Sequence, residues 1–185
     1  MKFVKQLLKE GISKEEVYER AVDKGLDKKR VSTYLANFPD QDLAGKYKKL
    51  NLILVSLVSV WACLGLLQAV LIMFKLPLLA GIMMMILVIA ILTLIIYNVY
   101  TMKSMSYFIL CFFAGKSILN SVGALRSFSS IVEAIFIGLV MLLSLTIIVL
   151  AVLLKKKVFP YQNFINSKQA DDGTILYSQK VATAS

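Results

Sequence analysis

The sequence contains no histidine, which removes the commonest general base, metal ligand and physiological pH sensor. It also has no glycine-rich phosphate loop and no cysteine cluster with metal-ligand spacing. Its two cysteines, Cys63 and Cys111, both lie in apolar runs, so we expect buried thiols rather than a disulfide. These absences predict a protein without metal or cofactor and argue against an enzyme.

Acidic residues are scarce as well: 11 Asp and Glu stand against 21 Lys and Arg, for a net charge of +10. Apolar residues make up 58% of the chain, and the mean hydropathy is +0.76. Such a composition indicates that a lipid bilayer is the natural solvent. Most basic residues flank apolar runs, so they are explained by membrane orientation, and nucleic acid is not an expected partner.

Four apolar runs, each about 20 residues or more, are long enough to cross the hydrocarbon core. They cover about 52–74, 78–100, 105–125 and 130–154. The predicted fold is all-α, a polytopic membrane protein whose residues 51–154 form a four-helix transmembrane bundle. No cleavable signal peptide is expected, because the first apolar run follows a charged segment of about 50 residues.

Residues 1–38 predict a small N-terminal head of three helices. Gly11 and Gly25 are the expected helix stops. Ser13 and Glu16 have the spacing of a reciprocal capping box, and Asp27 is a plausible N-cap for the third helix. About 38 residues make a marginal core, so we expect the head to lean on the membrane, on the rest of the chain or on a partner. A DNA-binding head is a weaker alternative, because eight acidic residues are mixed among the bases before residue 43.

Basic residues concentrate at both ends of the chain. The head and the basic linker 39–50 carry twelve Lys and Arg, and the tail 155–185 begins with three consecutive lysines. The three turns between the apolar runs carry one basic residue each. With four spans, the positive-inside rule predicts that both termini are cytoplasmic. The end of the tail is expected to be disordered, and the absence of eukaryotic sorting signals favours a bacterial inner membrane.

Polar residues at membrane depth are few and are the candidate site. Lys116 and Asn120 share one face of the third span, and Glu133 lies about one turn into the fourth. With Gln68 of the first span and Arg126 at the rim, they predict one polar cluster toward the outer side. Lys116 should point into the bundle and reach toward Glu133.

Three roles for this cluster remain open: an ion pair that fixes helix packing, a site for an anion, lipid head group or transported ion, and a contact with a partner subunit. Ser117 beside Lys116 would make a poor Ser–Lys dyad, because adjacent residues on a helix do not face each other. A small-residue face, which lets helices approach closely, is formed instead by Ala114, Ser117, Ser121 and Ala124.

The leading functional hypothesis is therefore a non-enzymatic integral membrane protein that binds another protein, as an accessory subunit, an adapter or an immunity-type protein. Another membrane protein or a second copy are the expected partners. The alternative is a small oligomeric transporter or channel component that uses Lys116 and Glu133, since four spans rarely enclose a pore alone.

Overall fold

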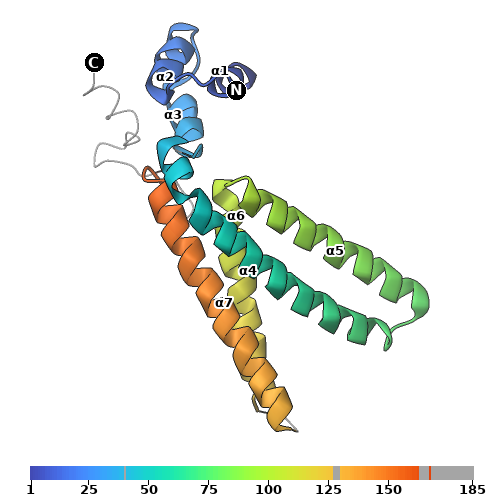
Figure 1. Ribbon diagram of the computed structural model, residues 1–185. Coiled ribbons are helices and arrows are strands. Elements are labelled where there is room, and N and C mark those ends of the chain that lie inside the picture. Colours follow the sequence, from blue (N-terminus) through green and yellow to red (C-terminus); the bar gives the residue numbers. More distant parts are fainter. Residues whose placement is uncertain (40, 127–129, 163–166, 168–185) are drawn as a thin grey trace.

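The computed structural model describes residues 1–39, 41–126, 130–162 and 167, apart from the side chains of Lys9, Gln41, Asp42 and Leu71. This part of the chain is helical, with one isolated bridge between Gln162 and Ser167. Three short helices come first and four long ones follow (Figure 1). Their bounds are α1 Lys2–Lys9, α2 Lys14–Asp23, α3 Lys28–Ala36, α4 Gln41–Met73, α5 Leu78–Tyr100, α6 Ser104–Ala124 and α7 Ile131–Val158.

The head helices begin and end where the sequence predicts. Gly11 and Gly25 follow α1 and α2 with φ of +78° and +79°, a conformation that favours glycine. The Asp27 carboxylate accepts the backbone N–H of Arg30 at 2.7 Å, as an N-cap should. Together the three helices bury an apolar core of their own: Val4, Leu7, Leu8, Val17, Ala21, Val31, Leu35 and Ala36.

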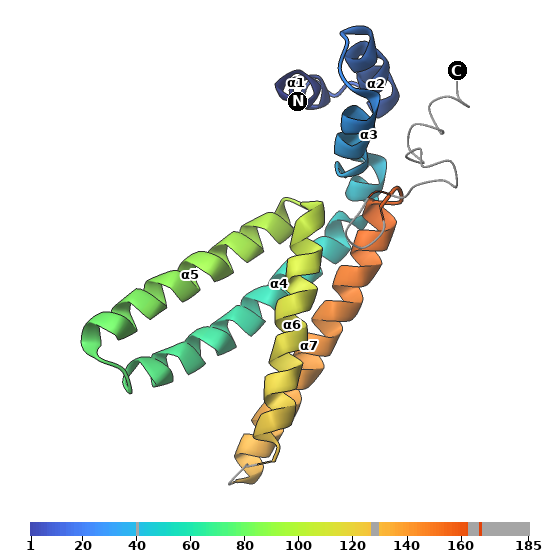
Figure 2. The ribbon, with the colours of Figure 1, turned by 180° about the vertical axis from the view of Figure 1, so that it is seen from behind.

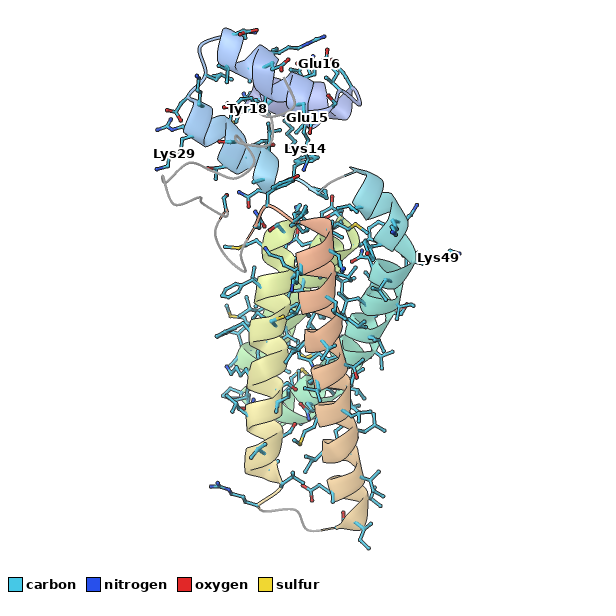
Figure 3. The ribbon with its side chains drawn as sticks, turned by 90° about the vertical axis from the view of Figure 1, so that its left-hand side faces the viewer. Lys14, Glu15, Glu16, Tyr18, Lys29 and Lys49 are labelled. Carbon is cyan, nitrogen blue, oxygen red and sulfur yellow. The ribbon has the colours of Figure 1, made fainter. Side chains whose placement is uncertain are left out.

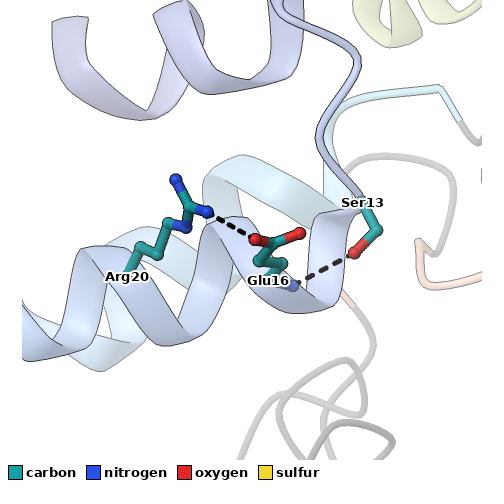
Figure 4. Close-up of polar contacts among 3 residues, drawn as sticks. All are labelled: Ser13, Glu16 and Arg20. Carbon is teal, nitrogen blue, oxygen red and sulfur yellow. Dashed lines mark hydrogen bonds and ion pairs between the residues drawn. The ribbon is translucent and has the colours of Figure 1, made fainter.

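The capping box at the start of α2 is only half formed. The Ser13 hydroxyl accepts the backbone N–H of Glu16 at 3.3 Å, as expected. The Glu16 carboxylate does not reach back to Ser13, because it pairs with Arg20 one turn later at 2.6 Å (Figure 4). The reciprocal bond that the sequence predicted is therefore replaced by an exposed i,i+4 ion pair, a contact worth only a few tenths of a kcal/mol.

All four long helices are long and apolar enough to cross a membrane. They form two antiparallel hairpins, α4 with α5 and α6 with α7, and α4 also packs against α7. The hairpins meet at the end near the head and diverge away from it (Figures 1 and 2). The start of α4 and the end of α7 therefore lie at the same end, which we call the head-proximal end; the other is the far end.

The transmembrane core sits at the head-proximal end, where all four helices contribute. Tyr107 and Leu110 of α6 face Ile147 and Leu154 of α7 there, with Leu54 of α4 beside them, and all five are fully buried. Along α5, by contrast, only Gly81, Ile95 and Val99 are buried. The four helices thus form two hairpins that share a core at one end, not a bundle closed along its length.

Two predicted boundaries differ from the observed helices. Residues 41–50 of the predicted linker already belong to α4, because no proline follows Pro39 until Pro77. The predicted fourth span ends at Leu154, whereas α7 continues through the three lysines to Val158. The predicted disorder near the C-terminus concerns residues outside the described part.

Candidate functional site

The five residues of the predicted cluster, Gln68, Lys116, Asn120, Arg126 and Glu133, are all exposed. Among the described residues, Gln68, Lys116 and Asn120 have no hydrogen bond or ion pair with one another or with Glu133. The backbone N–H of Glu133 is capped by the Ser130 hydroxyl at 3.2 Å. The structure therefore does not bring the five side chains together.

The rotation of α6 explains why Lys116 lies outside. Ala114 and Ser121 are buried, as the predicted small-residue face requires. Ser117 lies on the same face and accepts hydrogen bonds from Trp61 Nε1 of α4 at 3.4 Å and from the Ser144 hydroxyl of α7 at 3.3 Å. Since adjacent helix residues point about 100° apart, this contact turns Lys116 away from α4 and α7.

The divergence of the hairpins explains the position of Gln68. Trp61 still touches α6, but α4 then leaves α6 toward the far end (Figures 1 and 2). Gln68 lies two turns beyond Trp61 and is exposed. The spans could be read from hydropathy, but the angle between hairpins has no such signal.

Lys116 and Asn120 consequently form a polar strip on the outer face of α6, with Leu119 and Gly123 beside them, and all four are exposed. The Cα atom of Lys116 lies about 18 Å along the helix axis from Ser104 and about 12 Å from Ala124, at 1.5 Å per residue. A Lys at the centre of a transmembrane helix costs about 3 kcal/mol even on mild insertion scales.

A first buried polar bridge, which the sequence did not suggest, joins three helices at the head-proximal end. The Tyr107 hydroxyl of α6 donates to Asn51 Oδ1 of α4 at 2.8 Å. Asn51 Nδ2 donates in turn to the Val99 carbonyl of α5 at 3.0 Å. Asn51 and Tyr107 are 2% and 0% exposed, so this bridge ties both hairpins together inside the core.

A second polar chain runs from α7 to the head. The Lys155 ammonium, 3% exposed, donates to the carbonyl and hydroxyl oxygens of Ser104 at 3.0 and 2.5 Å. The Ser104 hydroxyl donates to Gln162 Oε1, and Gln162 Nε2 donates to Asn37 Oδ1 at the end of α3. Lys155 also lies in the last turn of α7, where the helix dipole favours a cation.

The head rests on the transmembrane part through further contacts. Tyr161, just after α7, packs against the head core. Lys14 donates to the Phe38 carbonyl at 2.7 Å, which ties α2 to the segment leading into α4. In Figure 3, Lys14, Glu15 and Tyr18 lie on the head, whereas Lys49 points away from α4 toward the surroundings. The head therefore contacts the rest of the chain, which is one of the three supports expected for so small a core.

Sequence signals for these buried residues existed but were weak. Lys155 continues the buried stripe Ile147 and Ala151 at a spacing of four residues, yet it also begins a lysine run that is typical of a membrane boundary. Asn51 is a polar residue at the start of an apolar run, which reads equally well as a boundary. Neither spacing nor composition identifies the partner of a buried polar group.

Among the described residues, no group of three or more His, Cys, Asp and Glu side chains is placed to hold a metal ion. The arrangement offers packing and hydrogen bonding at the head-proximal end and an exposed polar strip on α6. In comparisons with known proteins, the chain matches no family model, no curated protein and no solved structure.

Proposed function

We propose that this chain is a non-enzymatic integral membrane protein that binds another protein through its transmembrane helices. The observation that carries the proposal is the exposed strip of Lys116 and Asn120, at membrane depth and without a hydrogen bond or ion pair among the described residues. Exposed apolar side chains are satisfied by lipid, but an ammonium and an amide are not. A second protein is the simplest source of the missing hydrogen-bond partners.

The divergence of the two hairpins supports the same proposal. The two hairpins pack together mainly through α4 and α7, with a smaller contact between α5 and α6, and their shared core lies at the head-proximal end. Besides Lys116 and Asn120 of α6, Gln68 of α4 is a further exposed polar side chain. Transmembrane helices associate through close packing and interhelical hydrogen bonds, and the outer faces of α4 and α6 present polar groups that can form them.

The proposal includes a location. Both termini lie in the cytoplasm, with the head-proximal end at the cytoplasmic face of a bacterial inner membrane. The Lys and Arg residues of the head, of α4 up to Lys49 and of the end of α7 support this orientation. The head, held to α7 by Gln162, is then available to soluble and membrane partners on that side.

Purification from the native membrane in a mild detergent, followed by measurement of the particle mass, tests the proposal. Other polypeptides retained at a fixed stoichiometry are the expected result. A particle that contains only this chain would contradict it. In that case an oligomeric transporter becomes the better hypothesis, and ion flux in liposomes, with a Lys116→Met variant as the control, decides that alternative.

A further inference from the structure

We infer that the outer face of α6 binds a transmembrane helix of a different protein, and that this helix carries a carboxylate opposite Lys116. The inference rests on the proposed function and specifies its partner. The face consists of Lys116, Leu119, Asn120 and Gly123, which are spaced three and four residues apart and are all exposed. It offers an ammonium, an amide, an apolar knob and a small residue for close approach.

Charge complementarity selects a carboxylate as the partner group. An ammonium at membrane depth gains most from an anionic acceptor, because a charge-assisted hydrogen bond is about twice as strong as a neutral one. Asn120, one turn farther along α6, can donate its amide to the same carboxylate or to a neighbouring polar side chain. A partner with only apolar residues would bury Lys116 without an acceptor, which is costly in a low-dielectric medium.

A second copy of this chain does not fit the face. A two-fold dimer with its axis along the membrane normal would set two α6 helices side by side and in parallel, since such an interface is isologous. Each Lys116 would then face the Lys116 of the other copy, and like charges repel. The face is therefore built for a different partner.

The chain also lacks a suitable carboxylate of its own. Glu133 is the only acidic residue in the sequence ranges of the four candidate spans. It lies in the first turn of α7, about 3 Å from the far end of that helix, whereas Lys116 lies about 12 Å from the far end of α6, by the rise of 1.5 Å per residue. The expected carboxylate therefore lies nearer mid-membrane and on another polypeptide.

Designed probe helices test this inference without knowledge of the natural partner. A leucine–alanine transmembrane helix of about 20 residues carries Glu, Gln or Leu at mid-length and a fluorophore at one end. Its association with the full-length labelled chain is measured by energy transfer in phosphatidylcholine vesicles. We expect the Glu helix to bind about tenfold more tightly than the Leu helix, with the Gln helix between them.

Variants of the chain assign the effect to the α6 face. Lys116→Met should abolish the preference for the Glu helix, and Lys75→Met, which removes an exposed lysine outside the helices, should leave it unchanged. Lys116→Glu should reverse the preference toward a probe helix that carries Lys. Because Lys116 is exposed, each variant should retain the helical circular dichroism of the native chain.

Several outcomes would overturn the inference. One is equal binding of the Glu and Leu helices, and another is a preference for the Glu helix that survives Lys116→Met. Lys116-dependent energy transfer between two copies of the chain would identify a second copy as the partner. Loss of the preference for the Glu helix when anionic lipid is added would show that lipid phosphate occupies Lys116. The proposed function and this inference can be told apart. If other polypeptides co-purify with the native chain and equally with the Lys116→Met variant, the proposed function stands and this inference is wrong.

Discussion

The buried bridge of Tyr107, Asn51 and the Val99 carbonyl allows a quantitative prediction. Tyr107→Phe removes the hydroxyl that donates to Asn51 Oδ1 at 2.8 Å and leaves that oxygen without its donor in the core. The Val99 carbonyl is less affected by a change at Asn51, because it also accepts the backbone N–H of Met102 at 3.0 Å. We expect Tyr107→Phe to destabilise the fold by about 1 kcal/mol.

A double-mutant cycle isolates the bond between the two side chains. Asn51→Leu leaves the Tyr107 hydroxyl without an acceptor, so each single variant loses the same bond. The double variant should then cost less than the sum of the two singles, by about 0.6 kcal/mol, the average for interhelical hydrogen bonds in a membrane protein, and by no more than about 1.7 kcal/mol. A matched control is Ser56→Ala of α4, because this exposed hydroxyl bonds only to the Leu52 carbonyl of its own helix.

The assay is equilibrium unfolding of the full chain in mild detergent as a denaturing detergent is added. Helical circular dichroism reports the global transition. The fluorescence of Trp61, the single tryptophan, reports its contact with α6. The changes in unfolding free energy of the control pair, Ser56→Ala and Tyr107→Phe, should add to within about 0.3 kcal/mol. If the changes of Tyr107→Phe and Asn51→Leu add equally well, the bridge does not join the hairpins as described.

Other predictions concern the head and the turns. Gly25→Ala should destabilise α2 and α3 by about 1 kcal/mol, because Gly25 has a φ of +79°. Asp27→Ala should destabilise α3 by a similar amount, because the helix loses its N-cap. Amide hydrogen exchange of the head measures both effects, and unchanged exchange would contradict them. Gly81→Val should weaken the packing at the α4–α5 turn, since even a Cβ atom at Gly81 would lie 2.7 Å from the Met73 side chain and 3.1 Å from the Met73 carbonyl oxygen. A lower midpoint of unfolding is the expected result, and an unchanged midpoint would count against this close approach. Gln162→Ala should speed amide hydrogen exchange in α3 and leave that of α5 unchanged, because it removes the hydrogen bond from Gln162 to Asn37 of the head. If the exchange rate in α3 is the same in the variant as in the native chain, the link is refuted.

The sequence was sufficient for the elements whose signals are local. Four long apolar runs predicted four long helices, and Gly25 and Asp27 marked the boundary between two head helices because a positive φ and a side-chain cap are properties of a few neighbouring residues. The small-residue face of Ala114 and Ser121 was also predictable, because its spacing places both residues on one side of a helix.

The tertiary polar contacts were not predictable in the same way. The proposed cluster assumed that all four helices pack along their whole length, so that Gln68 and Lys116 meet. Their positions depend on the rotation of α6 and on the angle between the hairpins, and neither property has a sequence period of its own. The burial of Lys155 depends on the Ser104 oxygens 51 residues away, a pairing that a single sequence does not encode visibly.

Site-specific photocrosslinking in the native membrane tests the central claim most directly. A photoreactive residue replaces Leu119 on the outer face of α6, or Met83 on α5 as the control. The two side chains are 73% and 65% exposed, and each lies five residues from the far end of its helix, at Ala124 or at Leu78. We predict that Leu119, and not Met83, gives a crosslink to a second, different polypeptide. Crosslinks to lipid alone from Leu119, or the same products from both positions, would contradict partner binding through α6.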